Sequence, residues 1–221
     1  WPVIGWPSDV ESINRRQAQE YFDTFYAPDN IAAVIAGDID PERTLELARE
    51  YFGRIPGAKT PPPQMITVEV EPVGEKRFTA EVDTNTRVTL RYHTPPFNHA
   101  DNFPLQLFAD SLEGRTGRLY KALAEERQLI SGEPRVSLNE LKYAGYFEVS
   151  AEVKEGVAPE TVETAIIEEM EKLKTEPLGE RELQRLKNNL LALSVKQLQT
   201  NFYLVLQTLF YESMDSWEYI N

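Results

Sequence analysis

Two histidines, His93 and His99, are the side chains of this chain best suited to bind a metal ion. They lie on either side of Pro95 and Pro96. A zinc-binding pair is usually spaced by about four residues on a helix or about two on a strand, and consecutive prolines keep the two histidines off a shared regular element. We therefore expect both histidines to be structural or solvent-exposed, and we expect no metal site in this chain.

Paired carboxylates are the next candidates, because two nearby acids can act as general acid and general base. Glu125 with Glu126, and Glu168 with Glu169, are adjacent pairs on predicted helices. Neighbouring helical residues diverge by about 100°, so the members of a pair face different directions. A solvated helix surface is the better interpretation. The chain contains no cysteine, which excludes a thiolate metal site and a cysteine nucleophile.

The glycines Gly114 and Gly117 enclose a short segment with Arg115, and Arg118 follows directly. Such a segment could hold an anion at the start of a helix, where backbone N–H groups are unpaired. A loop between two helices needs no ligand, however, and glycine is common in loops for conformational reasons alone. A simple connecting loop is the favoured interpretation, with the anion site as the alternative.

The charge balance limits the kinds of partner that the chain can bind. Its 23 Lys and Arg against 36 Asp and Glu give a net charge of −13. A surface this acidic argues against nucleic acid and anionic membranes as partners. It is compatible with cationic peptides, although a contribution to solubility is the favoured interpretation. No run of about 18 apolar residues occurs, so no membrane span is predicted.

The first part of the chain has the pattern of a helix, a strand and a second helix. A helix is predicted over 15–26, because Asn14 and Gln17 have the spacing of a capping box. The apolar, β-branched run 31–36 is short enough to be a buried strand. The second helix is predicted to begin at Pro41, since proline is favoured in the first turn.

Residues 56–64 form the predicted linker, because their three consecutive prolines favour an extended spacer. Beyond the linker, strand-like patterns occur at 66–70, 77–82, 87–92 and 146–153. Helical patterns occupy most of the remaining chain. They lie at about 103–112, 117–128, 158–173, 183–193 and 202–211.

Four short segments have recognisable sequences. They are Tyr26–Asn30, Gly37–Glu42, Gly117–Leu123 and Glu180–Asn188. In this order they resemble segments of the insulinase/pitrilysin/mitochondrial processing peptidase family, in the region downstream of its inverted zinc motif His-x-x-Glu-His. The motif itself does not occur in this sequence. The resemblance therefore covers the part of the family's chain that lacks the zinc chemistry.

The resemblance implies an α+β fold, in which an antiparallel sheet is backed by helices and homologous domains form a clamshell. Residues 1–55 would be the tail of an upstream, zinc-type domain, and 65–221 the front part of the second, non-zinc domain. The family's zinc is held by the two motif histidines and a later glutamate, while the motif glutamate acts as general base on the zinc-bound water. Zinc is therefore expected in the parent protein, bound upstream of Trp1.

One departure from the family pattern concerns substrate binding. Many members carry an Arg and a Tyr in the second domain, within Leu-Arg-x-x-x-x-Leu-x-Tyr. Ala124 and Ser131 stand at these positions here. Alanine has no hydrogen-bond donor and serine is too short to replace a phenol, so this role is expected to be lost. In two-chain members, the zinc and the Arg/Tyr pair can lie on different subunits.

We therefore predict that this chain is the non-zinc C-terminal portion of a zinc-dependent endopeptidase acting on peptides. It would contribute to a substrate chamber and pack against a homologous domain or subunit, and it would be inactive alone. The alternative is a part of a non-catalytic structural or substrate-binding subunit of a two-chain peptidase. A further hypothesis is that 10–55 packs as a permuted or swapped part of the second domain. The cellular compartment stays open.

Overall fold

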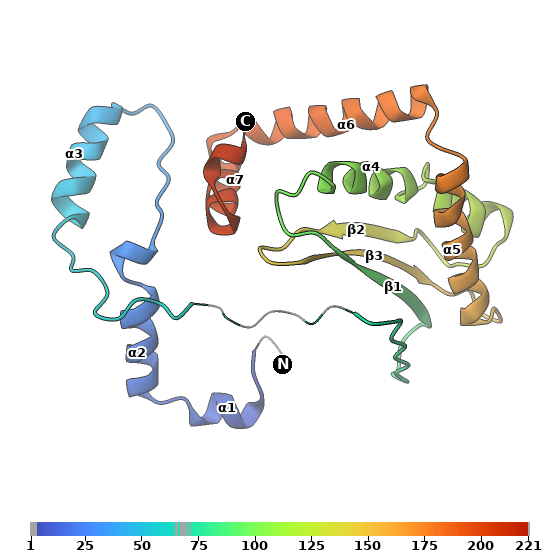
Figure 1. The fold of residues 1–221 in the computed structure, drawn as a ribbon, viewed down its shortest axis with the longest axis horizontal. Coiled ribbons are helices and arrows are strands. Elements are labelled where there is room, and N and C mark those ends of the chain that lie inside the picture. The colour runs from blue at the N-terminus through green and yellow to red at the C-terminus, as the bar shows by residue number, and fades with distance from the viewer. Residues whose placement is uncertain (1–3, 65, 67–69, 71, 221) are drawn as a thin grey trace. The chain divides into compact units, whose positions relative to one another are not determined.

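The computed structural model describes residues 4–64, 66, 70 and 72–220 (Figure 1). The chain divides into two compact units, residues 1–78 and residues 79–221. The predicted linker 56–64 contains neither helix nor strand. The start of the linker contacts the first unit, because the Ala58 N–H donates to the Asp29 carboxylate at 3.0 Å.

The first unit is built from short helices. They are α1 (Pro7–Ser12), α2 (Arg15–Phe25), the 3₁₀ turn η1 (Pro28–Asn30) and α3 (Pro41–Phe52). The predicted capping box is confirmed at the start of α2. The Gln17 N–H donates to Asn14 Oδ1 at 3.1 Å, and the Asn14 N–H donates to Gln17 Oε1 at 3.0 Å. These bonds satisfy two donors that a bare helix end leaves unpaired.

The strand predicted over 31–36 is wrong. The segment does not form a strand, and Ile31 and Ile35 are each 55% exposed. A β-strand needs a neighbour to complete its main-chain hydrogen bonds, and the described part of the first unit contains no strand to pair with. The apolar pattern that predicts burial is therefore left largely exposed.

The second unit contains a three-stranded antiparallel sheet, which agrees with the α+β fold that the family resemblance implies. Its strands are β1 (Arg87–Thr94), β2 (Arg135–Asn139) and β3 (Gly145–Glu152), in the order β1-β3-β2. β1 and β3 confirm two of the predicted strands. Strand β2 is absent from the predicted elements, although its apolar Val136 and Leu138 alternate with polar residues.

Two other predicted strands have different outcomes. The strand predicted over 77–82 is wrong, because these residues are not in a strand and Phe78 is 92% exposed. The strand predicted over 66–70 cannot be compared, since 67–69 lie outside the described residues.

The predicted helices of the second unit are confirmed. They are α4 (Asn102–Leu112), α5 (Pro159–Thr175), α6 (Glu180–Leu198) and α7 (Asn201–Met214), followed by the 3₁₀ turn η3 (Trp217–Ile220). The helix predicted over 117–128 is present as the π-helix η2 (Tyr120–Glu126). Its wider winding is visible at its end, where the Arg127 N–H donates to the Ala122 carbonyl at 3.1 Å.

The core lies between one face of the sheet and helices α4, α5 and η2 (Figure 1). The residues on this face alternate along the strands, as the period of two requires. Val136 and Val149 are paired across β2 and β3, and both are buried. Leu112, Leu123 and Ile166 from the three helices complete this core without measurable exposure.

The opposite face of the sheet is polar. Arg91 and Glu148 lie directly across from each other on β1 and β3 and form an ion pair. The Arg91 guanidinium also lies 4.2 Å from the centre of the Tyr146 ring. The helices therefore cover one face of the sheet and leave the other to polar side chains. Within the described residues, no helix is both long and apolar enough to cross a membrane.

Candidate functional site

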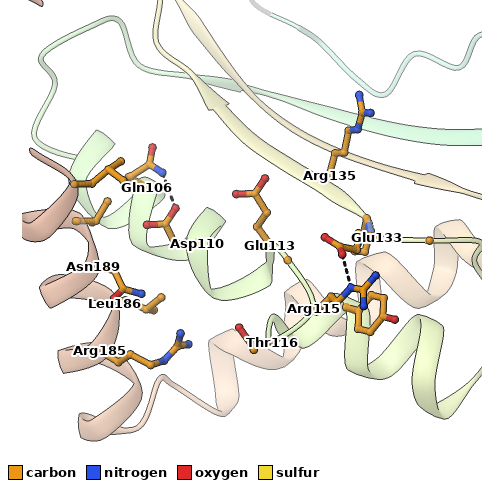
Figure 2. Close-up of a pocket in the computed structure, with 16 residues that line it drawn as sticks. Gln106, Asp110, Glu113, Arg115, Thr116, Glu133, Arg135, Arg185, Leu186 and Asn189 are labelled. Atoms are coloured by element: carbon orange, nitrogen blue, oxygen red, sulfur yellow. Dashed lines mark hydrogen bonds and ion pairs between the residues drawn. The ribbon is translucent and has the colours of Figure 1, made fainter. Parts of the chain in front are cut away.

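A cavity of about 940 Å³ lies where α4, the loop after it, the start of β2 and α6 meet (Figure 2). Its volume falls within the range of small-ligand pockets. One wall is a single face of α6, because its lining residues recur every three or four positions. These residues are Arg185, Leu186, Asn189, Leu190 and Leu193.

The loop 113–117 closes one end of the cavity and depends on its two glycines. Gly114 has a φ of +73°, a conformation that side chains with a Cβ disfavour. At Gly117, a Cβ would lie 2.3 Å from the Glu113 carbonyl oxygen and 2.4 Å from that of Leu112. No larger residue fits there without movement of the backbone, so the glycines set the course of the loop.

Arg115 of this loop and Arg118 directly after it are both engaged by carboxylates. Arg115 Nε donates to Glu133 Oε1 at 2.6 Å. Arg118 donates to Glu182 Oε2 at 2.9 Å, and thereby ties the loop to the first turn of α6. Both contacts agree with a connecting loop stabilised by ion pairs, the favoured interpretation from the sequence.

Two other arginines of the cavity have no acceptor in the described part of the chain. They are Arg135 at the start of β2 and Arg185 on α6. Arg135 is on the polar face of the sheet, because its neighbour Val136 is on the buried face, and in Figure 2 its side chain extends away from α6. Guanidinium groups present five donors in a planar fork that matches a carboxylate. Of the two, only the Arg185 guanidinium is therefore available to an anionic ligand on the α6 side of the cavity.

The acidic groups of the cavity differ in their environment. Partial desolvation raises the pKa of Glu113 above its ordinary value of 4.5, and the negative charge of Asp110 adds to this effect. Asp110 in turn accepts a hydrogen bond from Gln106 Nε2 at 2.8 Å. Glu113 is therefore the carboxylate of this site that is held least favourably in its charged form.

The two histidines do not come together as a metal site. His93 is exposed on β1, opposite Tyr146. His99 is exposed, and its Nδ1 accepts a hydrogen bond from the Asp101 N–H at 3.2 Å. The described residues contain no group of three or more His, Asp or Glu side chains able to hold a metal ion. The donor set in these residues therefore does not fit zinc.

The positions of the family's Arg and Tyr lie in different surroundings. Ala124, on η2, is partly buried and packs against the core. Ser131 is exposed, and its N–H donates to the Glu152 carbonyl at 2.8 Å. Neither residue lines the cavity. The loss of a substrate-binding role at these two positions stays a prediction.

The cavity residues Glu113, Arg135 and Arg185 are not among those that the sequence singles out. They come from three elements that are far apart along the chain, and each is a common surface residue type. Only Gly114 and Gly117 of the loop 113–117 give a sequence pattern that points to this region. Without the tertiary structure, nothing in the sequence places these three residues around one cavity.

Comparison with known proteins shows extended similarity. The zinc protease PqqE of Helicobacter pylori is 25% identical over 209 residues, which cover 91% of this chain and 46% of that protein. Core protein I of the ubiquinol-cytochrome-c reductase complex of Euglena gracilis is 28% identical over 111 residues, or 50% of this chain and 22% of that protein. The chain thus spans less than half the length of these curated relatives.

The fold agrees with a solved structure. A protease from Helicobacter pylori superimposes with a TM-score of 0.80 at 19% identity, over 99% of this chain and 53% of that one. The model of the peptidase M16 inactive domain matches residues 12–190. This match covers most of the chain, including the three-stranded sheet and the cavity residues other than Leu193. The chain therefore belongs to the peptidase M16 family through the family's inactive domain.

Proposed function

We propose that this chain forms part of the substrate chamber of a zinc-dependent endopeptidase that cleaves peptides. The observation that carries the proposal is the match of residues 12–190 to the peptidase M16 inactive domain. The similarity to a zinc protease about twice as long supports a parent protein with a further region. In this parent, zinc would be bound upstream of Trp1.

The sheet supports the proposed place of this chain in the chamber. Helices cover one face, whereas the other carries polar groups such as Arg91, Tyr146 and Glu148. An uncovered polar sheet face suits the wall of a water-filled compartment better than a packed interior. Under this proposal, the polar face would point toward the substrate.

The chain's own residues would supply no metal chemistry. The described donor groups do not fit zinc, so this chain would shape the chamber and leave the hydrolytic step to the zinc-bearing region. The absent Arg and Tyr at positions 124 and 131 would be supplied by a homologous domain or subunit, if they are used at all.

A second candidate is a non-catalytic subunit with a structural or substrate-binding role. The observation in its favour is the similarity to a protein named as a core component of a respiratory complex rather than as a peptidase. The two candidates differ in the region upstream of Trp1. An intact His-x-x-Glu-His and later glutamate favour the peptidase, and a degenerate motif favours the subunit.

The test is peptide hydrolysis by the parent protein and by this chain. The parent, loaded with zinc, is expected to cleave an unstructured peptide, and chelation should abolish the activity. Residues 1–221 alone should cleave nothing, with or without zinc. An inactive parent that retains its zinc would contradict the first candidate, and zinc-dependent cleavage by the chain alone would contradict both.

A further inference from the structure

We propose that a small pocket beside α7 binds a lysine or arginine side chain of another polypeptide. The pocket has a volume of about 350 Å³ and lies where α7 meets the end of α6 and the segments that follow β1 and β2. It shares no lining residue with the larger cavity of Figure 2. The proposal does not rest on the proposed function, because it requires no cleavage of the bound polypeptide.

One face of α7 provides most of the pocket wall. Residues three or four positions apart lie on the same side of a helix, and the lining residues of α7 have this spacing. They are Tyr203, Leu206, Gln207, Phe210 and Tyr211. Phe97, from the segment after β1, forms another part of the wall.

The aromatic rings of the pocket are inclined to one another. The centre of the Phe97 ring lies 5.9 Å from that of Phe210 at an angle of 89°, and 5.5 Å from that of Tyr211 at 37°. Gln207 Nε2 donates to the Tyr211 hydroxyl at 2.9 Å, which helps to fix the position of this ring. The rings thus form a corner rather than a flat stack. The negative face of an aromatic ring attracts a cation within about 6 Å.

Glu140 provides the charge of the pocket. It is half-buried directly after β2, and it is the one charged residue among those that line the pocket. Its carboxylate has no hydrogen-bond or ion-pair partner in the described part of the chain. Lys142 follows two residues later, but its ammonium group donates to the Ser213 carbonyl at 3.1 Å and does not line the pocket. A carboxylate beside aromatic rings favours a cationic ligand.

The rim of the pocket indicates a side chain rather than a free small cation. Tyr203, Leu206 and Phe210 are each about half exposed. A free amine would leave much of this apolar surface in water, whereas the aliphatic stem of lysine or arginine and the adjoining backbone can cover it. The net charge of −13 also favours the approach of a basic segment.

The test is titration of the isotope-labelled chain 1–221 with short peptides, followed by NMR chemical shifts. The probes are pentapeptides with blocked ends, which carry lysine, arginine, norleucine or glutamate in the centre and glycine elsewhere. Norleucine keeps an aliphatic stem like that of lysine but has no charge. The lysine and arginine peptides are expected to bind at least about tenfold more tightly than the norleucine peptide. The largest shifts should occur at the residues that line the pocket.

Substitutions locate the binding. Glu140→Gln should weaken the lysine peptide by about tenfold, and Phe97→Leu by about threefold or more. Glu218→Gln is the matched control for Glu140→Gln, since it removes an exposed carboxylate from η3, next to α7, but outside the pocket. Thermal unfolding of each variant verifies that the fold is retained.

Free n-butylammonium tests the choice of a side chain. It carries the same cation without a backbone, and it should bind at least about threefold more weakly than the lysine peptide. Equal affinity would overturn the assignment to a polypeptide and indicate a site for small amines.

Other outcomes would overturn the cation site itself. Equal binding of the lysine and norleucine peptides would remove the role of the charge, and preference for the glutamate peptide would reverse it. An equal loss in Glu140→Gln and Glu218→Gln would reduce the effect to general electrostatics. Binding to the chain and peptide cleavage by the parent are separate measurements, so failure of one leaves the other interpretable.

Discussion

Gly117 shows how closely a single residue of the loop 113–117 is constrained. Its missing Cβ would lie 2.3 Å and 2.4 Å from two carbonyl oxygens. We expect Gly117→Ala to lower the free energy of unfolding by about 1–3 kcal/mol, the typical cost of overpacking. Urea unfolding measures this change.

The matched control is Gly179→Ala, where an added Cβ meets no atom within 4 Å and φ is −64°. This substitution should change the stability little. Equal losses in both variants would show that the crowding around Gly117 does not determine its effect.

Glu113 makes the stability of the chain depend on pH. Because its pKa is raised in the folded state, the stabilisation from its protonated form is fully present below the unfolded value of about 4.5 and is lost as the pH rises through the folded pKa. Glu113→Gln should therefore be more stable than the unaltered chain at pH 7, and the difference should shrink below pH 4.5. The charged groups that share its cavity are Asp110, Arg115, Glu133, Arg135 and Arg185.

Thermal unfolding between pH 3.5 and pH 8 checks this expectation, with Glu125→Gln as a control for loss of an exposed carboxylate outside the cavity. A gain at Glu113→Gln that is the same at every pH would contradict the argument from desolvation.

Among the elements, α5 and η2 are joined through a buried carboxylate. The Glu169 side chain is 7% exposed and accepts from Arg127 at 3.3 Å and from Lys172 at 2.5 Å. Removing one donor from a buried charge leaves it partly uncompensated. Arg127→Gln is therefore expected to cost about 1–3 kcal/mol in the free energy of unfolding.

Glu168→Gln is the comparison for Arg127→Gln, because it removes an exposed partner of the same arginine. Glu168 is 52% exposed and pairs with the same arginine at 2.8 Å. An exposed ion pair contributes about 0–1 kcal/mol, so chemical denaturation should show the smaller loss for this variant. The reverse order would contradict the role given to burial.

The helices and the strands differ in how far the sequence predicts them. Helix α2 is predicted closely, because the capping box at Asn14 and Gln17 is local. The segment 31–36 has an equally clear apolar pattern, but a strand also requires a partner, and none is present in the described first unit. Strand β2 alternates polar and apolar residues, but with only two apolar positions, Val136 and Leu138, this signal is weak.

The cavity shows a second limit of the sequence. Its loop glycines are predicted as a connecting segment, but residues of α4, β2 and α6 line one cavity only through the packing of these elements. Charged surface residues are common, and their spacing along the chain contains no information on a contact between distant elements. The family resemblance supplies the fold class, but not this site.

For the whole molecule, the two units differ in their cores. The hydrophobic core cluster lies entirely within residues 109–166, whereas Ala27 is the one buried apolar residue among those described in the first unit. We expect limited digestion with chymotrypsin to cut exposed aromatics of the first unit, such as Phe22 and Phe52, before exposed aromatics on core-packed helices of the second unit, such as Phe103. Mass spectrometry of the products identifies the boundary.

Protection of 10–55 in the same digestion would contradict this expectation. It would favour the alternative hypothesis in which this segment packs as a permuted or swapped part of a second domain. Size-exclusion chromatography with light scattering then distinguishes a monomer from an exchanged dimer.

The order β1-β3-β2 leaves the outer edges of β1 and β2 without a strand partner in the described chain. Amide protons of residues 146–150 of β3, which are paired on both sides, should therefore exchange slowly with deuterium. Those of β1 and β2 should alternate between slow and fast. In the parent protein, a strand added to either edge would abolish that alternation on its side. The hydrogen–deuterium exchange rates of the eight residues of β1, measured amide by amide, would then show whether another part of the parent completes the sheet.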